Sequence, residues 1–291
     1  MKYFNQLLFI GFLFSSICYS QITNNNELLL VKTARFIHSQ QYAFDVIKLN
    51  FPEQKTAIED VELGFDKNFG AAIETINTKT KNLLGNKYES FIENLNNELN
   101  EYSINDIKSR LQGPIESPVL EILLAYKYQN NPVDEFVSNY VNTYSVKSYS
   151  NSTKVNLSLK VPLSWKELDG DSYTMLKKFR NEFGTGNVSI TLSTKKSPKV
   201  TLINNNLARI SQYDQTNSKS GIHKRYIVEH LYLSEGKVLE IKCTINSTTD
   251  NDLDVEYLKF SPLYKSIVKS VHIIKESEND NSFYTATKRK L

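Results

Sequence analysis

The side chains best suited to acid-base or nucleophilic chemistry are few in this sequence and lie far apart. The histidines are His38, His223, His230 and His272, and the cysteines are Cys18 and Cys243. An imidazole or a thiol needs a partner within hydrogen-bond reach to act as a base or a nucleophile. Glu229 directly precedes His230, but neighbouring residues of a strand point to opposite faces and cannot form one local site. We expect His38 at the surface and His272 in packing.

A short acidic segment has the spacing of oxygen ligands in a calcium loop. Asp250-Asn251-Asp252-Leu253-Asp254 places oxygens at alternate positions, but the sixth position lacks glycine and the twelfth is Ser261 instead of glutamate. Because carboxylates are favourable at helix starts, we interpret the segment as the acidic start of a helix. The chain also lacks Gly-x-Ser-x-Gly, His-Glu-x-x-His, a phosphate-binding glycine loop and Cys-x-x-Cys. The sequence therefore predicts no catalytic set, metal or cofactor.

The charge and composition are those of an ordinary folded protein. The chain has 291 residues, 40% hydrophobic and 23% charged, with a net charge of +3. This charge is too small to imply a nucleic-acid partner. Two basic runs, Lys177–Arg180 and Lys195–Lys199, have acidic residues nearby, so we interpret them as solvated faces. Abundant asparagine, lysine and isoleucine suggest a bacterial source.

The first twenty residues have the plan of a secretory signal peptide. Lys2 is followed by the apolar run Leu7–Phe14, and Cys18-Tyr19-Ser20 places small residues before a cut at Gln21. A membrane anchor would need about 20 apolar residues, and a lipoprotein signal would carry a small residue where Ile17 stands. We expect residues 1–20 to be cleaved and the mature chain, without a transmembrane segment, to be periplasmic or extracellular.

Cleavage would leave Cys243 as the one cysteine of the mature chain. It lies in the alternating run Val238–Ile245, on the same side as Leu239 and Ile241. A thiol on the apolar side of a strand packs as a small hydrophobic group, so we expect a buried structural thiol.

The spacing of apolar residues predicts an all-helical domain over residues 21–148, with five to seven short helices. Glu27 to Leu49 is the clearest helix, with Asn26 as its expected cap and a stripe that lies along one side. This stripe comprises Leu30, Ala34, Ile37, Gln41, Phe44 and Ile47. Asn86 and Ser103 are expected to cap two further helices. Gly64 and Gly70 leave the boundaries between residues 54 and 84 open.

Residues 149–275 carry the pattern of an antiparallel sheet domain with packed helices. Every second residue of Lys154–Val161 is apolar, and Pro162 ends this strand. The serine-rich segment Ser145–Thr153 before it is expected to be the linker between the domains. Turn residues at Gly184–Gly186 and Ser234–Lys237 predict two hairpins.

Two segments of this domain admit other assignments. Ser172–Phe183 fits a helix face, but we favour a strand because a hairpin turn follows it. Asp252–Val271 reads as helical, with Pro262 expected to start a new segment. His272–Ile274 is expected to close the sheet as a short strand, and residues 276–291 to form a disordered polar tail.

Three segments of the second domain resemble PsbP-like domains. They are the strand and corner Val155–Trp165, the hairpin Tyr232–Leu239 and the closing segment Leu258–Val271. The resemblance implies an antiparallel sheet with helices packed on it, in a family whose members serve mostly as assembly or accessory factors. It transfers no metal-binding or partner-binding residue to this chain, and it leaves the helical half without a counterpart.

The favoured hypothesis is an exported, non-catalytic protein that binds another protein or a component of the cell envelope. Its candidate binding surface comprises Trp165, Tyr226, His230 and Tyr232. Trp165, the single tryptophan, has two interpretations: a ring that fills the edge of the core, which we favour, or a ring that lines a groove.

Two alternatives remain open at this point. An extracytoplasmic hydrolase could have a site between the domains, where Cys243 meets His230 or Glu229 meets Asp254. A carrier of a small apolar ligand would need a lined cavity beneath the sheet.

Overall fold

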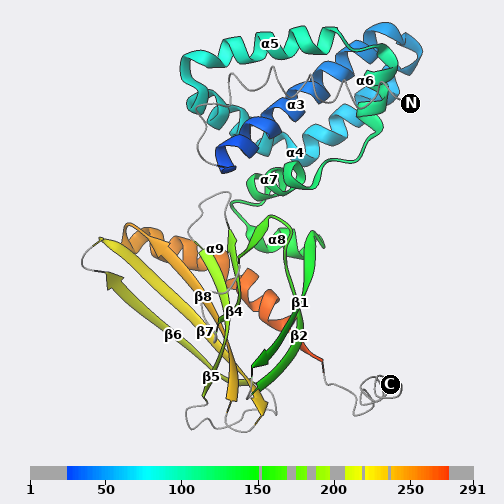
Figure 1. Ribbon diagram of the computed structural model, residues 1–291. Coiled ribbons are helices and arrows are strands. Elements are labelled where there is room, and N and C mark those ends of the chain that lie inside the picture. Colours follow the sequence, from blue (N-terminus) through cyan, green and yellow to red (C-terminus); the bar gives the residue numbers. More distant parts are fainter. Residues whose placement is uncertain are drawn as a thin grey trace, which may run out of the picture. The chain divides into compact units, whose positions relative to one another are not determined.

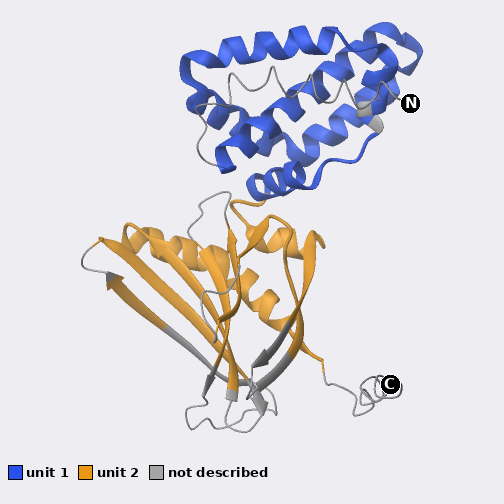
Figure 2. Ribbon diagram, viewed as in Figure 1, with its two compact units in different colours: residues 1–127 blue, residues 128–291 orange. Residues whose placement is uncertain are grey.

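The computed structural model divides the chain into two compact units, residues 1–127 and 128–291 (Figure 2). It describes residues 25–150, 153–168, 175–181, 188–196, 207–217, 220–234 and 237–274. The expected signal peptide and polar tail lie outside these residues. A helical part precedes antiparallel sheets, which confirms the α+β class.

The first unit is helical throughout its described part (Figure 1). Its elements are α3 (Asn25–Asn50), η1 (Pro52–Gln54), α4 (Lys55–Leu84), η2 (Gly85–Lys87), α5 (Tyr88–Asn100), α6 (Ile104–Gln112) and α7 (Ser117–Lys127). The expected stripe on α3 is buried at Ala34, Ile37, Phe44 and Ile47, whereas Gln41 is exposed. Burial of this stripe against α4 and α7 holds the unit together.

The bounds of helix α4, which the sequence left open, enclose both glycines. Gly64 and Gly70 both lie inside its 30 residues, and no other atom would crowd a Cβ at either position. Buried residues at helical spacing, such as Ile73 and Ile76, carry the helix onward. The helix ends at Gly85, whose φ of +53° is costly for residues with a Cβ.

The expected caps have different outcomes. The Asn26 cap is wrong, because α3 already includes Asn25 and Asn26 lies inside the helix. Ser103 is confirmed, because its hydroxyl accepts from the Asp106 backbone N–H at 3.2 Å and its own N–H donates to the Asp106 carboxylate at 3.3 Å. This reciprocal pair is the capping box. The Asn86 cap is wrong: this residue lies in η2, and α5 follows Lys87 without a side-chain cap.

The second unit contains two antiparallel sheets and two α-helices in its described part. Its elements are α8 (Pro132–Val137), β1 (Val141–Ser150), β2 (Thr153–Pro162), β3 (Trp165–Leu168), β4 (Met175–Asn181), β5 (Val188–Lys196), β6 (Leu207–Asn217), β7 (Ile222–Ser234), β8 (Lys237–Ser247), α9 (Asp250–Lys269) and β9 (His272–Ile273). One sheet has the order β1-β2-β9, and the other has the order β3-β4-β5-β8-β7-β6. The predicted strand β4 and the β4–β5 and β7–β8 antiparallel pairs are confirmed.

The domain boundary lies earlier than predicted. The unit division falls after Lys127 instead of residue 148, and the expected linker is strand β1 as far as Ser150. Strand β1 pairs with β2 along its whole length, from Val141 opposite Pro162 to Ser150 opposite Thr153. Its serines give no apolar alternation, so its hydrogen bonds to β2 define it as a strand.

Helix α9 packs along one face of the six-stranded sheet, on β7 and β8 (Figure 1). Thr249 caps it by accepting from the Asp252 backbone N–H at 3.2 Å, which confirms the acidic segment as a helix start. The expected break at Pro262 is wrong, because α9 continues through it. Pro262 is exposed, and Leu258, whose carbonyl loses its helical donor, is 70% exposed, so water can satisfy that carbonyl.

The corner between β2 and β3 is fixed by a buried carboxylate. Glu135 on α8, only 2% exposed, accepts hydrogen bonds from the backbone N–H of Ser164 at 2.8 Å and from its hydroxyl at 2.7 Å. Burial raises the pKa of Glu135 to about 7, although the Ser164 hydrogen bonds lower it. The next residue, Trp165, is 4% exposed and packs edge-on against Phe260 of α9.

Arg225 connects β6, β7 and α9. Its guanidinium, on β7, donates to Asp214 of β6 at 2.7 and 3.0 Å and to Asp254 of α9 at 2.6 Å. The Tyr257 ring lies 5.1 Å from the same group. The hydrogen bonds to Asp214 raise the pKa of Arg225 further above its usual range. We call these contacts of Arg225 with Asp214 and Asp254 the Arg225 tie. They lie on the same face of the sheet as α9.

Candidate functional site

The two faces of the six-stranded sheet differ in chemistry. Residues such as Ile241 and Cys243 lie on the α9 side and belong to the core. Because side chains alternate along a strand, their neighbours lie on the opposite face. That opposite face carries a set of basic and tyrosine side chains, which we call the cationic face. Its members are Lys178 and Arg180 on β4, Tyr213 on β6, Lys224 and Tyr226 on β7, and Lys242 on β8.

Strand register brings these residues together from distant parts of the chain. Lys178 lies opposite Thr191, and Thr191 lies opposite Lys242. In the adjacent row, the order runs Arg180, Ser189, Thr244, Tyr226 and Tyr213. The basic residues are therefore spaced by hydroxyl side chains across the sheet.

The electrostatics of the cationic face are unbalanced. Within the described residues, Lys178, Arg180, Lys224 and Lys242 form no ion pair. Glu240, which is 5% exposed, is the one acidic residue among the described strand residues on this side of the sheet. Its carboxylate lies 3.3 Å from His230 Nε2 and accepts from the Ser193 hydroxyl at 3.5 Å. We call the part of the face that carries the four cations, all at least partly exposed, the exposed half. The field over this half is therefore positive.

The aromatic rings support one of the cations. The Tyr213 and Tyr226 rings lie 4.9 Å apart at an angle of 33°, and the Lys242 ammonium lies 5.2 Å from the Tyr226 ring centre. Tyr213 is 48% exposed. These contacts hold Lys242 and Tyr226 in place without neutralising the charge.

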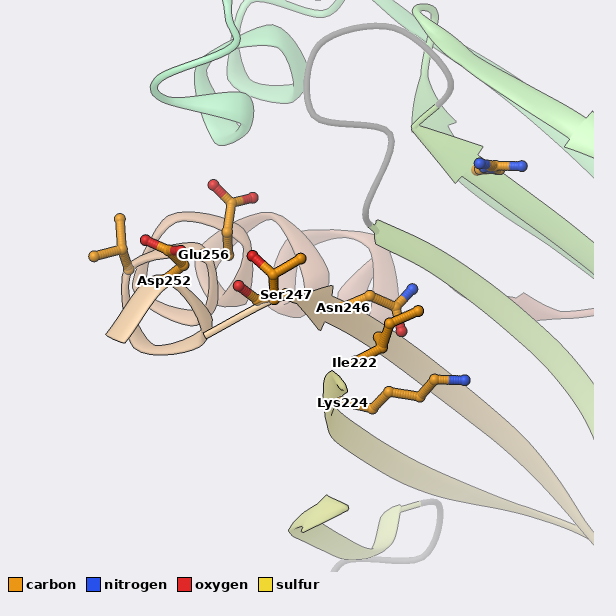
Figure 3. Close-up of a pocket in the computed structure, with 9 residues that line it drawn as sticks. Ile222, Lys224, Asn246, Ser247, Asp252 and Glu256 are labelled. Atoms are coloured by element: carbon orange, nitrogen blue, oxygen red, sulfur yellow. The ribbon is translucent and has the colours of Figure 1, made fainter. Parts of the chain in front are cut away.

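A pocket of about 480 Å³ adjoins the cationic face, at the end of the sheet where β8 leads into α9 (Figure 3). Its lining residues are Arg180, Ile222, Lys224, Asn246, Ser247, Thr248, Asp252, Val255 and Glu256. Figure 3 shows Asp252 and Glu256 on α9, and Lys224 and Asn246 on the strands. Both carboxylates have partners: Asp252 accepts from the Thr249 hydroxyl at 2.6 Å, and Glu256 pairs with Lys259 at 3.2 Å. The lining is therefore mixed, with Arg180 and Lys224 on the sheet side, Asp252 and Glu256 on the helix side, and apolar side chains at Ile222 and Val255.

The structure treats the candidate binding residues differently. Tyr226 and His230 lie on the cationic side of β7, as alternation requires. Tyr232 lies in the same strand, and its side chain falls outside the described part. The prediction that Trp165 belongs to the candidate surface is wrong. Its ring is buried on the α9 side, where it packs among the apolar side chains of the core.

The two pairings considered for a hydrolase do not form. Cys243 lies opposite Ile227 and His230 lies opposite Glu240, so alternation places the thiol and the imidazole on opposite faces. Glu229 is buried, and burial raises its pKa while the charge of Lys265 lowers it. Asp254 instead pairs with Arg225. Neither pair can act as a nucleophile with its base.

The remaining histidines have local partners or terminal positions. His223 Nδ1 lies 2.5 Å from Asp250 Oδ1, and His38 Nε2 lies 2.7 Å from Asn96 Oδ1. His272 lies in β9. Across the described ranges, no group of three or more His, Cys, Asp or Glu side chains could hold a metal ion. No helix in that part of the chain is long and apolar enough to cross a membrane.

Cys243 is expected to be inert in the folded protein. Its side chain is 1% exposed, and burial raises the pKa of the thiol to about 12. Because the thiolate is the reacting form, a disulfide reagent such as dithionitrobenzoate should label residues 21–291 in the native state at least about a hundredfold more slowly than in the denatured state. Absorbance of the released thiolate measures both rates. Equal rates in native and denatured protein would contradict the burial of this thiol.

Comparisons with known proteins supply no relative for this chain: no family model, no curated protein and no solved structure matches it.

Most of the cationic face is absent from the sequence-based candidates. Lys178 and Arg180 belong to a run interpreted as a solvated face, and no motif contains Lys224 or Lys242. The predicted β7–β8 hairpin is the signal that could have found these last two lysines, since it places both near Tyr226. No local signal places β4 beside them, because β5 intervenes in the sheet.

Proposed function

We propose that this chain is an exported, non-catalytic binding protein of the cell envelope, and that its partner binds to the cationic face. The observation that carries the proposal is the gathering of Lys178, Arg180, Lys224 and Lys242 on one sheet face, without an acidic partner in the described part of the chain. The sheet fixes the positions of their backbones, and cations gathered on one face attract an anionic partner.

The pocket beside the face supports binding over the carriage of an apolar ligand. An apolar ligand requires a cavity lined mainly by hydrophobic side chains. This pocket offers such a ligand Ile222 and Val255, whereas its other lining residues are polar or charged, with Arg180 and Lys224 on the sheet side and Asp252 and Glu256 on the helix side.

We propose further that residues 149–275 are a PsbP-like domain. Strand β2 leads into the Trp165 corner, β7 and β8 pair as a hairpin, and α9 is followed by β9. This is the order of elements that the resemblance implies. An accessory role without catalysis agrees with that assignment.

Export is the second part of the proposal, and the residue pattern of positions 1–20 supports it. Expression of the full chain in a bacterial host, followed by mass spectrometry of the protein in each compartment, tests it. A mature chain that starts at Gln21 outside the cytoplasm is the expected result. An intact N-terminus on the exported protein would contradict cleavage.

The binding role is tested by capture from an envelope extract. The mature chain with Lys178→Gln and Lys224→Gln should retain much less of the envelope component than the unchanged chain, because two cations of the face are lost. Lys242 is left in place because its ammonium contacts the Tyr226 ring. Circular dichroism checks that both proteins are folded.

The matched control carries Lys160→Gln and Lys269→Gln. These exposed lysines lie on β2 and α9, away from the cationic face, and their loss changes the net charge equally. The control should capture the component as the unchanged chain does. The binding role would be refuted if both double variants captured it equally.

A further inference from the structure

We infer that the partner of the cationic face is an acidic polysaccharide, a sugar chain that carries carboxylate groups. This inference rests on the proposed function, since it names the class of partner for the same face. It depends on three features of the exposed half: spaced cations, hydroxyl side chains between them, and few apolar anchors.

The first feature is the spacing of the charges. Lys178 and Lys242 lie in one row with one strand between them, which places their backbones about 10 Å apart. Arg180 lies two residues from Lys178 on the same strand, and therefore on the same face. Charges spread in two directions suit a polymer with repeated anionic groups better than a single small anion.

The second feature is the set of hydroxyl groups between the charges. Ser189 and Thr191 on β5 and Thr244 on β8 separate the basic residues, and each is partly exposed. Hydroxyl groups both donate and accept hydrogen bonds, which suits a ligand whose own surface is rich in hydroxyls. The exposed Tyr213 ring adds a flat amphipathic surface at the edge of the face.

The third feature separates a polysaccharide from an acidic protein. Protein interfaces have a well-packed core that is enriched in aromatic side chains and methionine and depleted in lysine. On this face Val228 is 2% exposed and Val238 is fully buried, so neither can anchor a partner. The exposed half presents lysine, arginine, serine and threonine around one tyrosine pair, with Ile222, 37% exposed, as an apolar side chain at its end.

The pocket is the expected binding site for one end of the polymer. Arg180 and Lys224 belong both to the cationic face and to the pocket lining. An anionic group at the sheet side of the pocket would meet these two cations, whereas on the helix side Glu256 is paired with Lys259 and Asp252 keeps its charge. The rest of the chain can then extend over the sheet.

The test is calorimetric titration of the mature chain with polygalacturonate at low ionic strength. Poly-L-glutamate and neutral dextran are titrated in parallel, as a carboxylate polymer without sugar and a sugar polymer without charge. We expect polygalacturonate to bind at least about tenfold more tightly than either, and Lys178→Gln with Lys224→Gln to weaken it about tenfold. The Lys160→Gln with Lys269→Gln control should leave its affinity unchanged.

Two results would overturn the inference. Equal binding of poly-L-glutamate would indicate a partner recognised by charge alone, such as an acidic protein. Absence of polygalacturonate binding, or binding that the cationic-face variant leaves unchanged, would remove this class of ligand from the face. If the same variant still loses the envelope component in the capture experiment, the binding role stands and the polysaccharide assignment alone fails.

Discussion

Replacing Trp165 with alanine is expected to lower the free energy of unfolding of the second unit by about 3–5 kcal/mol. The ring is 4% exposed, and its centre lies 6.3 Å from that of Phe260 with the rings inclined at 64°. Its loss removes apolar surface from the core and leaves a cavity between β3 and α9. Because β3 is only four residues long, it has few other contacts with which to hold its position.

Denaturant unfolding followed by circular dichroism measures this loss. Trp165→Phe retains an aromatic ring against Phe260, so we expect a smaller loss than for alanine. Tyr213→Ala, at a ring that is 48% exposed, serves as the surface control. A loss below about 1 kcal/mol for Trp165→Ala would show that the ring is not part of the core. In the unchanged chain, fluorescence of this single tryptophan reports on the second unit alone.

The second unit is also expected to become more stable as the pH falls from about 7 to about 4.5, and Glu135 is the expected cause. Burial raises the pKa of its carboxyl from the ordinary value of 4.5 to about 7 in the folded protein. The folded form therefore binds a proton at a higher pH than the unfolded form. Over this interval Glu135 alone contributes up to about 3 kcal/mol, which is lost as the pH rises through about 7.

The variant Glu135→Gln isolates this effect. A glutamine can accept from the Ser164 N–H while its amide donates to the Ser164 hydroxyl, so the corner keeps its hydrogen bonds without a charge. Unfolding free energies at several pH values should show a flatter profile, with the largest gain over the unchanged chain above pH about 7. Asp134→Asn removes an exposed carboxylate from the same helix and should retain the slope. An unchanged slope in Glu135→Gln would assign the pH dependence to other groups.

The sequence predicts elements well where one periodicity dominates. The α3 stripe and the β2 alternation each bury one side of an element, and both are confirmed. Strand β1 escapes prediction because its hydrogen bonds to β2, rather than its own side chains, define it. The sequence leaves the bounds of helix α4 open because each of its two interior glycines costs about 1 kcal/mol of helix stability. The helix forms through both glycines because its buried residues contribute more than this cost.

The candidate site depends on information that no local pattern contains. The β7–β8 register shifts by an irregularity between Tyr232 and Ser234, which places Tyr226 opposite Thr244. A register one residue different would place Tyr226 beside the core residue Ile245, since each shift exchanges the two faces. The hairpin turn can be predicted, but this shift cannot. The same limit applies to β4, which reaches β8 only through β5.

The Arg225 tie has a consequence for how the sheet opens. Strand β6 is at the edge, and its neighbour β7 holds the guanidinium that binds both Asp214 and Asp254. If β6 separated from β7, the Arg225 side chain, which is 12% exposed, would lose its Asp214 partner. Unfolding of the first turns of α9 would likewise remove its Asp254 partner. The edge strand and the helix start should therefore detach as one cooperative segment, and their amide protons should exchange with solvent at matching rates.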